Sequence, residues 1–385
     1  MKINQMYNVL NDINDQLFGV DVVQTNDLSG LVALGTTIGN AVSYDKWLGQ
    51  LVDRIGKSII RRLSLTTRYP NLYKDSYIFG AILSKVTIDP IQASNNSSWD
   101  IGNPGFTPTL FDINKPSISV KYFDTADTAS FLVTVPFTQM ESAFKNESEM
   151  TAFMNGIVEA LQESIIHAID ACSQTAVNNF IAEKIKNANG VLHMLTMYNT
   201  AFPNATIATA DEAITDPNFL RYTSAQIKLY REYLEQPSVL YNVAGKVRRT
   251  PKESQNILLL SEFATNSQVY LESDTFWKDL LSLPGYVSVP FWQGDHAASG
   301  DNEFVTNSTI DVIPSSEAGS GSPTAVTQSY VLGLIADEYA VAVGLNKRRS
   351  AAQSNNIDGY TNLKEEFTTQ YINDLDENAI VILCD

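Results

Sequence analysis

The sequence predicts an α+β chain in which an arm, an extended β-hairpin and one very long helix precede alternating short helices and strands. In the hairpin region, apolar residues alternate with polar ones, which is typical of strands. In the long helix, apolar residues recur every three or four positions. After about residue 190, short segments with helical spacing are interspersed with short segments that look like strands. These patterns distinguish, within the 385-residue chain, an arm (1–75), a hairpin region (about 81–136), a long helix (about 149–186) and a mixed remainder (about 190–385).

The composition excludes several classes of protein. Hydrophobic residues make up 44% and charged residues 18%, which is globular rather than disordered. A net charge of −17 should repel nucleic acid and anionic membranes, so a sequence-reading DNA binder is excluded. Cys172 and Cys384 are too far apart for a CxxC motif and fit a reducing cytosol. We find no signal-peptide pattern and no apolar run of transmembrane length, and therefore expect a soluble protein.

The arm is predicted to contain two amphipathic helices, at about 3–17 and 44–63. The second helix has a basic C-terminal half that includes Arg61 and Arg62. A single short helix with one apolar stripe is not stable alone, so the arm should need partners.

The hairpin region contains two alternating segments, at about 82–88 and 118–122, and a third at 131–135. Between the first two lies a stretch rich in Asn, Ser, Gly and Pro, which predicts a long loop at the hairpin tip. The apolar residues in this loop include Trp99, Phe106 and Phe111.

The long helix is predicted from Glu149 to Lys186, after a possible capping box formed by Asn146 and Glu149. Its apolar stripe includes Ile157 and Leu161, which places Glu163 on the opposite face. After it, the sequence predicts helices at 223–236 and 274–283. Strands are predicted at 256–260, 286–292, 308–314, 331–336 and 339–345, and over 367–383 with a break at the Asp-Leu-Asp-Glu-Asn turn.

A search for chemistry finds no site. The 3 histidines form no HExxH motif, and Glu163 with His167 is better explained as a pair on a helix surface than as metal ligands. The chain has no GxSxG elbow, no P-loop and no GxGxxG turn between a strand and a helix. We therefore predict no catalytic residue, no metal site, no cofactor and no enzyme activity.

Three basic clusters stand out from the acidic background, around Arg61, Arg248 and Arg348. They are either solvated faces that balance local acids or contacts in which arginines grip carboxylates of a neighbouring subunit. Direct binding of nucleic acid is a third possibility, which the net charge disfavours. The candidate intersubunit contacts are Arg61, Arg62, Trp99, Phe106, Phe111, Arg248, Arg249, Lys347, Arg348 and Arg349.

The order of elements resembles that of the major capsid proteins of tailed double-stranded DNA bacteriophages, which have the HK97-type fold. The stretches SAQIKLYREYLEQPSVLYN, TPKESQNILLLSEFA and VPFWQGD are similar to that family's A-domain, and the segment from DEYAVAVGL to ENAIVIL is similar to its closing strands. The resemblance covers nearly the whole chain. It implies an N-terminal arm (1–75), an E-loop β-hairpin (76–137), a P-domain with the long spine helix (138–214), an A-domain (215–330) and closing strands of the P- and A-domains (331–385).

The resemblance implies a structural subunit of an icosahedral head that assembles into pentamers and hexamers around double-stranded DNA, without sequence-specific binding. Its partners would be further copies of itself, a portal protein and a separate scaffolding protein, with a decoration protein left open. The protein would be located in the virion after assembly in the host cytoplasm. Some members form a Lys–Asn crosslink, but nothing selects a pair from Lys85, Lys115 and Lys121 with Asn355, Asn356 and Asn362, so we predict none.

Two alternatives stay open at this point. An encapsulin, the shell protein of a bacterial nanocompartment, has the same fold and encloses an enzyme instead of DNA. A soluble metabolic or hydrolytic enzyme is the alternative from another class, and a deep pocket with convergent titratable groups would favour it.

Overall fold

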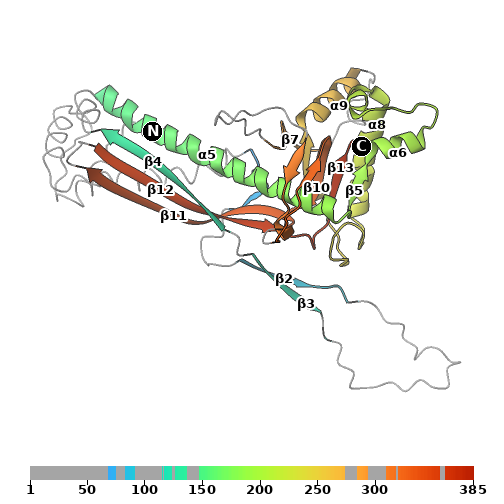
Figure 1. Ribbon diagram of the computed structural model, residues 1–385, viewed down its shortest axis with the longest axis horizontal. Helices are drawn as coiled ribbons and strands as arrows, with labels where there is room; N and C mark the ends of the chain where they lie inside the picture. The colour runs from blue at the N-terminus through green and yellow to red at the C-terminus, as the bar shows by residue number, and fades with distance from the viewer. Residues whose placement is uncertain are drawn as a thin grey trace. The chain divides into compact units, whose positions relative to one another are not determined.

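A computed structural model of the chain describes residues 68–74, 83–91, 115, 117–123, 126–136, 147–273, 284–293, 309–317, 320–355 and 360–385 (Figure 1). The predicted arm helices and the predicted helix at 274–283 lie outside these residues. None of the described helices is both long and apolar enough to cross a bilayer.

The described elements follow the predicted order along the chain. They are β1 (Tyr73–Lys74), β2 (Leu83–Ile88), β3 (Ile118–Phe123), β4 (Ala126–Pro136), α5 (Glu147–Lys186), β5 (Val191–His193), α6 (Met194–Ala201), α7 (Ala210–Thr215), α8 (Pro217–Leu234), β6 (Gln255–Leu260), α9 (Ser261–Ser273), β7 (Val287–Val289), β8 (Ile310–Val312), β9 (Val326–Gln328), β10 (Val331–Asp337), β11 (Val341–Asn355), β12 (Tyr360–Asn373) and β13 (Ala379–Leu383). Two short 3-10 turns occur at Lys252–Ser254 and Ser315–Glu317.

The chain divides into two compact units that interleave along the sequence. Unit 1 comprises Met1–Gly80, Thr125–Val177 and Val341–Ile372. Unit 2 comprises Ala81–Asp124, Asn178–Ala340 and Asn373–Asp385.

The described part of unit 1 contains a four-stranded sheet in the order β1-β11-β12-β4. One face of β12 is buried through Leu363 and Phe367, and Phe367 stacks on Phe131 of β4 with ring centroids 5.5 Å apart. The predicted strand at 131–135 therefore exists inside β4, but it pairs with β12 and not with the hairpin strands.

The long helix is confirmed, because α5 begins at Glu147 and ends at Lys186. Ile165 and Ile169 are buried, as the spacing of apolar residues predicts, and Glu163 lies exposed with its carboxylate 3.7 Å from His167. This geometry is that of a pair on a helix surface. The side chains of Ile157 and Leu161 are outside those that the structure describes.

Unit 2 is built around a five-stranded sheet in the order β5-β13-β10-β6-β7, beside which α6 and α9 pack (Figure 1). Every residue of β10 and β13 is buried, which is typical of central strands covered on both faces. Gly333 in β10 permits a close approach to β6, because a Cβ there would lie 2.7 Å from the carbonyl oxygen of Leu258.

Helix α8 begins six residues earlier than the pattern from 223 to 236 predicts, at Pro217. The side chain of Asp216 accepts hydrogen bonds from the amides of Asn218 and Phe219, both at 2.9 Å, and caps this first turn. Proline is favoured in this turn because it donates no hydrogen bond and its φ is already helical.

A buried lysine fastens the end of α5 to the rest of unit 2. The ammonium of Lys184 donates to the carbonyl oxygen of Tyr241 at 2.8 Å and to Oδ1 of Asn189 at 3.3 Å, and its side chain is fully buried. No carboxylate among the described residues pairs with it. Burial therefore lowers the pKa of Lys184 to about 7.

We expect the stability of unit 2 to rise with pH between about 7 and 10 because of Lys184. The unfolded chain keeps this proton up to the ordinary lysine pKa of 10.5, whereas the folded chain loses it near pH 7. The free energy of unfolding should gain a few kcal/mol over this window. Chemical denaturation at several pH values should show this slope for the parent and a flatter one for Lys184→Met, and equal slopes would contradict the assignment.

Candidate intersubunit site at the β2–β3 hairpin

The strands β2 and β3 form an antiparallel ribbon whose two faces differ in chemistry. The register runs from Leu83 opposite Phe123 to Ile88 opposite Ile118, which confirms the predicted hairpin of two strands. Because successive side chains of a strand point to opposite faces, Lys85 and Lys121 share one face and Val86 and Val120 share the other.

One face of this ribbon is an exposed row of apolar side chains, which we name the apolar ladder: Tyr122, Val86, Val120, Ile88 and Ile118. Their exposed fractions run from 44% for Val120 to 69% for Tyr122. Val86 lies opposite Val120 and Ile88 opposite Ile118, so the row is continuous across both strands. A continuous exposed apolar surface of this kind is typical of a protein–protein contact.

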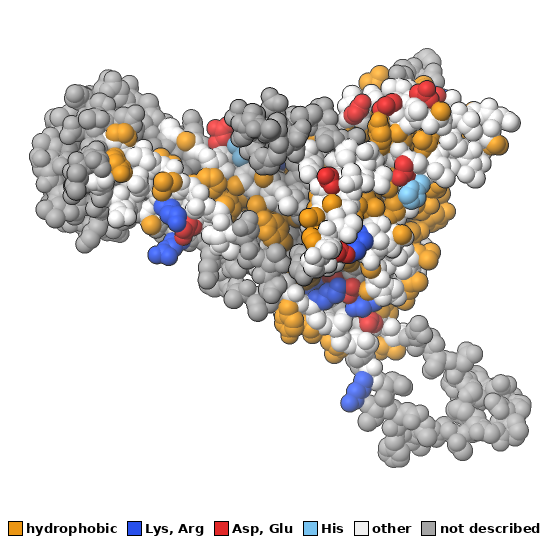
Figure 2. All heavy atoms as spheres, viewed as in Figure 1, with side chains coloured by type: hydrophobic (Ala, Val, Ile, Leu, Met, Phe, Trp, Pro, Cys, Tyr) orange, Lys and Arg blue, Asp and Glu red, His pale blue; other side chains and the backbone are white. Residues whose placement is uncertain are grey.

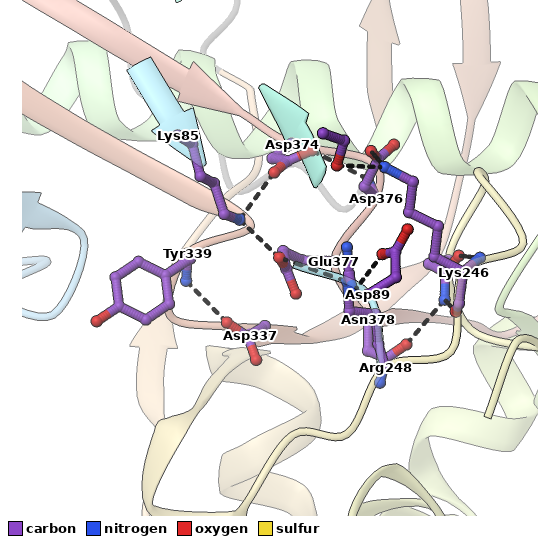
Figure 3. Close-up of polar contacts among 12 residues, drawn as sticks. Lys85, Asp89, Lys246, Arg248, Asp337, Tyr339, Asp374, Asp376, Glu377 and Asn378 are labelled. Atoms are coloured by element: carbon purple, nitrogen blue, oxygen red, sulfur yellow. Dashed lines mark hydrogen bonds and ion pairs between the residues drawn. The ribbon is translucent and has the colours of Figure 1, made fainter. Parts of the chain in front are cut away.

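The other face of the ribbon is held by the acidic turn between β12 and β13. The ammonium of Lys85 lies 2.8 Å from Oδ2 of Asp374 and 2.7 Å from Oε1 of Glu377 (Figure 3). The ammonium of Lys121 lies 2.9 Å from Oδ1 of Asp374 and 2.5 Å from Asp376. The carboxylate of Asp374 therefore bridges the two strands, with one oxygen on each lysine.

The segment before β6 adds two more cations to this face. Lys246 lies 2.8 Å from Oδ2 of Asp376 and donates to the hydroxyl of Ser119 at 3.1 Å. Arg248 donates to Asp89 at 3.3 Å, and its Nε lies 3.8 Å from Glu377. We name this set the ionic cluster: Lys85, Lys121, Lys246, Arg248, Asp89, Asp374, Asp376 and Glu377. Its four cations balance its four carboxylates, and the space-filling view shows blue and red side chains close together in this part of the molecule (Figure 2).

Backbone contacts place the acidic turn. The amide of Asp374 donates to the carbonyl oxygen of Ala340 at 2.7 Å, and the amide of Asp337 donates to that of Asn378 at 3.0 Å. Oδ1 of Asp374 also accepts from the amide of Asp376 at 3.1 Å, which is the local bond that aspartate favours in turns. These hydrogen bonds to the backbone hold the acidic turn in place independently of the hairpin lysines.

Three members of the ionic cluster have pKa values that are shifted in favour of their charged forms. Burial alone would raise the pKa of Asp374 and Asp376, but the lysines that bond them outweigh it and hold both pKa values below the usual range. Burial likewise opposes the charge of Lys121, yet Asp374 and Asp376 raise the pKa of that lysine. The neighbouring Asp337 differs, because burial raises the pKa of its carboxyl despite bonds from Tyr339 and Thr250.

Five of the predicted contact residues lie outside the described residues: Arg61, Arg62, Trp99, Phe106 and Phe111. Arg248 belongs to the ionic cluster and pairs with acids of its own chain, while Arg249 is exposed. Lys347, Arg348 and Arg349 lie on β11, where the side chain of Arg349 is exposed and the other two side chains are not described. The role of all ten residues in contacts between copies stays a prediction.

Sequence reasoning missed the ionic cluster, although it carries a signal. Each hairpin strand has a single charged residue, Lys85 in LSKVTI and Lys121 in ISVKYF. In the observed register these lysines lie opposite each other, which is unfavourable for like charges unless acids lie nearby. The acids come from the Asp-Leu-Asp-Glu-Asn turn, which is distant in sequence.

The described residues contain no group of three or more histidine, cysteine, aspartate or glutamate side chains that could hold a metal ion. The four carboxylates of the ionic cluster are instead paired with lysines and arginine. The ionic cluster holds one face of the β2–β3 ribbon against the rest of unit 2 and leaves the apolar ladder on the other face exposed.

The fold matches solved phage structures. A chain in the capsid structure of Staphylococcus phage Andhra is 13% identical, with 82% of this chain and 83% of that chain covered and a TM-score of 0.51. A chain in the structure of head fiber and inner core protein gp22 of native bacteriophage P68 is 11% identical, with 83% and 85% covered and a TM-score of 0.54. These similarities show the HK97-type fold. The comparison with curated proteins found no match.

The family is shown by a match over nearly the whole chain. The model of the Phi29-like phage major capsid protein family matches residues 9–383. This confirms the resemblance to phage major capsid proteins, and the comparisons give no support to an encapsulin or to an enzyme. The chain therefore belongs to the Phi29-like phage major capsid protein family and is a structural subunit of the shell of a phage head.

Proposed function

We propose that copies of this subunit form pentamers and hexamers that close around double-stranded DNA, and that the apolar ladder supplies one of the contacts between neighbouring copies. The observation that carries this proposal is the exposure of five apolar side chains on one face of a ribbon. Burying a valine or isoleucine of this kind contributes about 1.5–3 kcal/mol. A contact between copies would bury these side chains and gain this free energy. In the isolated subunit the side chains stay exposed to water.

The segment between the two hairpin strands would extend the same contact. It contains Trp99, Phe106 and Phe111, which lie outside the described residues and which the family resemblance assigns to the tip of the E-loop. Large aromatic side chains dominate the free energy of many protein interfaces.

The acidic charge suits a shell that encloses DNA without reading its sequence. A net charge of −17 on each copy opposes adhesion to phosphates, so the packaged genome would stay free to leave. This part of the proposal fails if the inner surface of the assembled shell carries net positive charge.

Further partners follow from the same role. We infer that a portal protein occupies one vertex of the shell, that a separate scaffolding protein guides assembly, and that assembly takes place in the host cytoplasm. A decoration protein remains a further candidate for the outer surface.

Electron microscopy of the purified protein tests the proposal directly. We expect closed shells or rings of five and six subunits, with better-formed shells when the scaffolding protein of the same phage is co-expressed. Small monodisperse particles under every condition, with and without the scaffolding protein, would contradict it.

A further inference from the structure

The hairpin is joined to the rest of unit 2 differently from the five strands of the central sheet. Within the described residues, β2 and β3 pair with each other and with no further strand, so neither extends the central sheet. The ladder faces solvent, which leaves the opposite face, on which the register places Lys85, Lys121 and the outermost pair Leu83 and Phe123, as the side that contacts unit 2. That face meets the body of the unit through ion pairs and through Lys85, whose ammonium lies 5.7 Å from the centre of the Tyr339 ring.

A junction built on ion pairs is more sensitive to dissolved salt than an apolar core is. The lysine side chains keep contact with water, with exposed fractions of 21% for Lys85 and 38% for Lys121, whereas the carboxylate of Asp374 between them is only 2% exposed. Opening the junction exposes all three groups to water, and dissolved salt stabilises the separated, hydrated charges. The ribbon itself is held by backbone hydrogen bonds between its two strands, which salt affects little.

Protonation of Asp374 and Asp376 does not open this junction near neutral pH. Asp374 and Asp376 have lowered pKa values, so their contribution is present above the ordinary aspartate range near 4 and is lost only as the pH falls below it. The raised pKa of Lys121 keeps that charge up to at least the ordinary lysine value of 10.5. The pKa of Asp337, at the end of β10, is raised by burial, so this carboxyl binds a proton at a higher pH than Asp374 and Asp376 do. It accepts hydrogen bonds from Thr250 and from the amide of Tyr339 and is not bonded to a hairpin lysine. Among the described residues, the other charged groups of the ionic cluster are Asp89, Glu377, Lys246 and Arg248, whose pairs are given above.

We propose that the ionic cluster is a latch opened by salt or by competing charged groups, so that the β2–β3 ribbon can change direction as one piece while the rest of unit 2 stays folded. The ribbon keeps its register and its apolar ladder in both states. In an assembled shell, this movement would let one subunit contact neighbours in different positions. That role rests on the proposed function. The latch itself is a property of the single subunit.

The direction of the ribbon can be measured by the distance between two spin labels on the full chain. One label replaces Ile91, which is 76% exposed and follows β2, and the other replaces the exposed Glu253 in the 3-10 turn before β6. Cys172 and Cys384 are first replaced by Ser and Ala. Measurements are made on unassembled subunits, as verified by ultracentrifugation, at about 50 mM and about 1 M salt, where the screening length falls from above 10 Å to about 3 Å.

We expect one narrow distance distribution at low salt and a broadened or shifted one at high salt. The double substitution Asp374→Asn/Asp376→Asn should give the broad distribution at both salt concentrations. The matched control Glu232→Gln/Glu235→Gln removes the two acids that pair with Lys252 on unit 2 and should behave as the parent does.

The single substitution Lys121→Met provides a second, milder opening of the latch in case the double variant fails to fold, which near-ultraviolet circular dichroism will show. A narrow, salt-independent distribution in the parent and in Lys121→Met would overturn the proposal. A broad distribution in the parent at low salt would overturn it as well. Shell formation by the same variants, scored by microscopy, is a separate readout, so a failed latch and a failed assembly role are distinguishable.

Discussion

Shell formation should be lost when the apolar ladder is made polar by Val86→Thr/Ile88→Thr/Val120→Thr. Threonine keeps the branched shape that favours strands, so the ribbon and its ionic cluster should remain. Each change removes about 1 kcal/mol of apolar burial from a contact, and three together should raise the protein concentration needed for assembly on the order of a hundredfold. Light scattering against concentration measures this threshold, and electron microscopy identifies the products.

The control uses other exposed apolar side chains of unit 2. Val269→Thr/Ile313→Thr makes the same chemical change at positions that are 59% and 47% exposed and lie outside the hairpin. We expect the control to assemble near the parent's threshold. An equal loss in both variants would show that the effect is not specific to the ladder, and normal assembly of the triple variant would exclude the ladder from shell contacts.

The largest expected effect on stability comes from Phe180→Ala. The ring of Phe180 is fully buried near the C-terminal end of α5 and is among the largest side chains of the core. Truncating a buried phenylalanine costs about 3–5 kcal/mol, because both the transfer free energy and the packing around the cavity are lost. A domain with a total stability of about 5–15 kcal/mol would lose a large part of it.

Urea denaturation of the variant should show the midpoint moving to much lower denaturant. Glu163→Gln is the comparison on the same helix, since its side chain is exposed and its partner His167 is exposed as well. Its free energy of unfolding should stay within about 0.5 kcal/mol of the parent's. Similar midpoints for the two variants would mean that α5 does not bury the face that we assign to it.

Elements with a strong local period were predictable from the sequence. The helix α5 was predicted within two residues at its start and correctly at its end, because its apolar residues keep one spacing for about ten turns. The strands β2 and β3 were predicted because apolar and polar residues alternate in both. In each case the burial that stabilises the element is visible as a periodic pattern in its own residues.

The helix α9 was missed because its buried face is not apolar throughout. Phe263, Ala264 and Ser267 are buried, so a small residue and a hydroxyl occupy positions where a stripe would show leucine or isoleucine. The helix also follows β6 directly, without a loop that would mark its start. Local patterning therefore carries too little signal there.

The partners of strands and charges were not predictable, because they depend on residues far along the chain. Alternation revealed the strand at 131–135 but not its pairing with β12. In the same way, 43 acidic residues offer many partners for Lys85 and Lys121, and only the fold selects the turn from Asp374 to Glu377. The sequence supports the family and the order of elements, whereas this site required coordinates.

The position of β13 has a consequence for synthesis. This strand lies between β5 and β10, so residues 379–383 complete a sheet whose other strands have already been translated. Until those residues leave the ribosome, the neighbouring edges of β5 and β10 have no partner, and unit 2 cannot reach its folded state. The acidic turn that receives the hairpin lysines immediately precedes β13 and arrives with it. A chain that stops before residue 374 would therefore lack both β13, a central strand of this sheet, and the acids that bind the hairpin lysines.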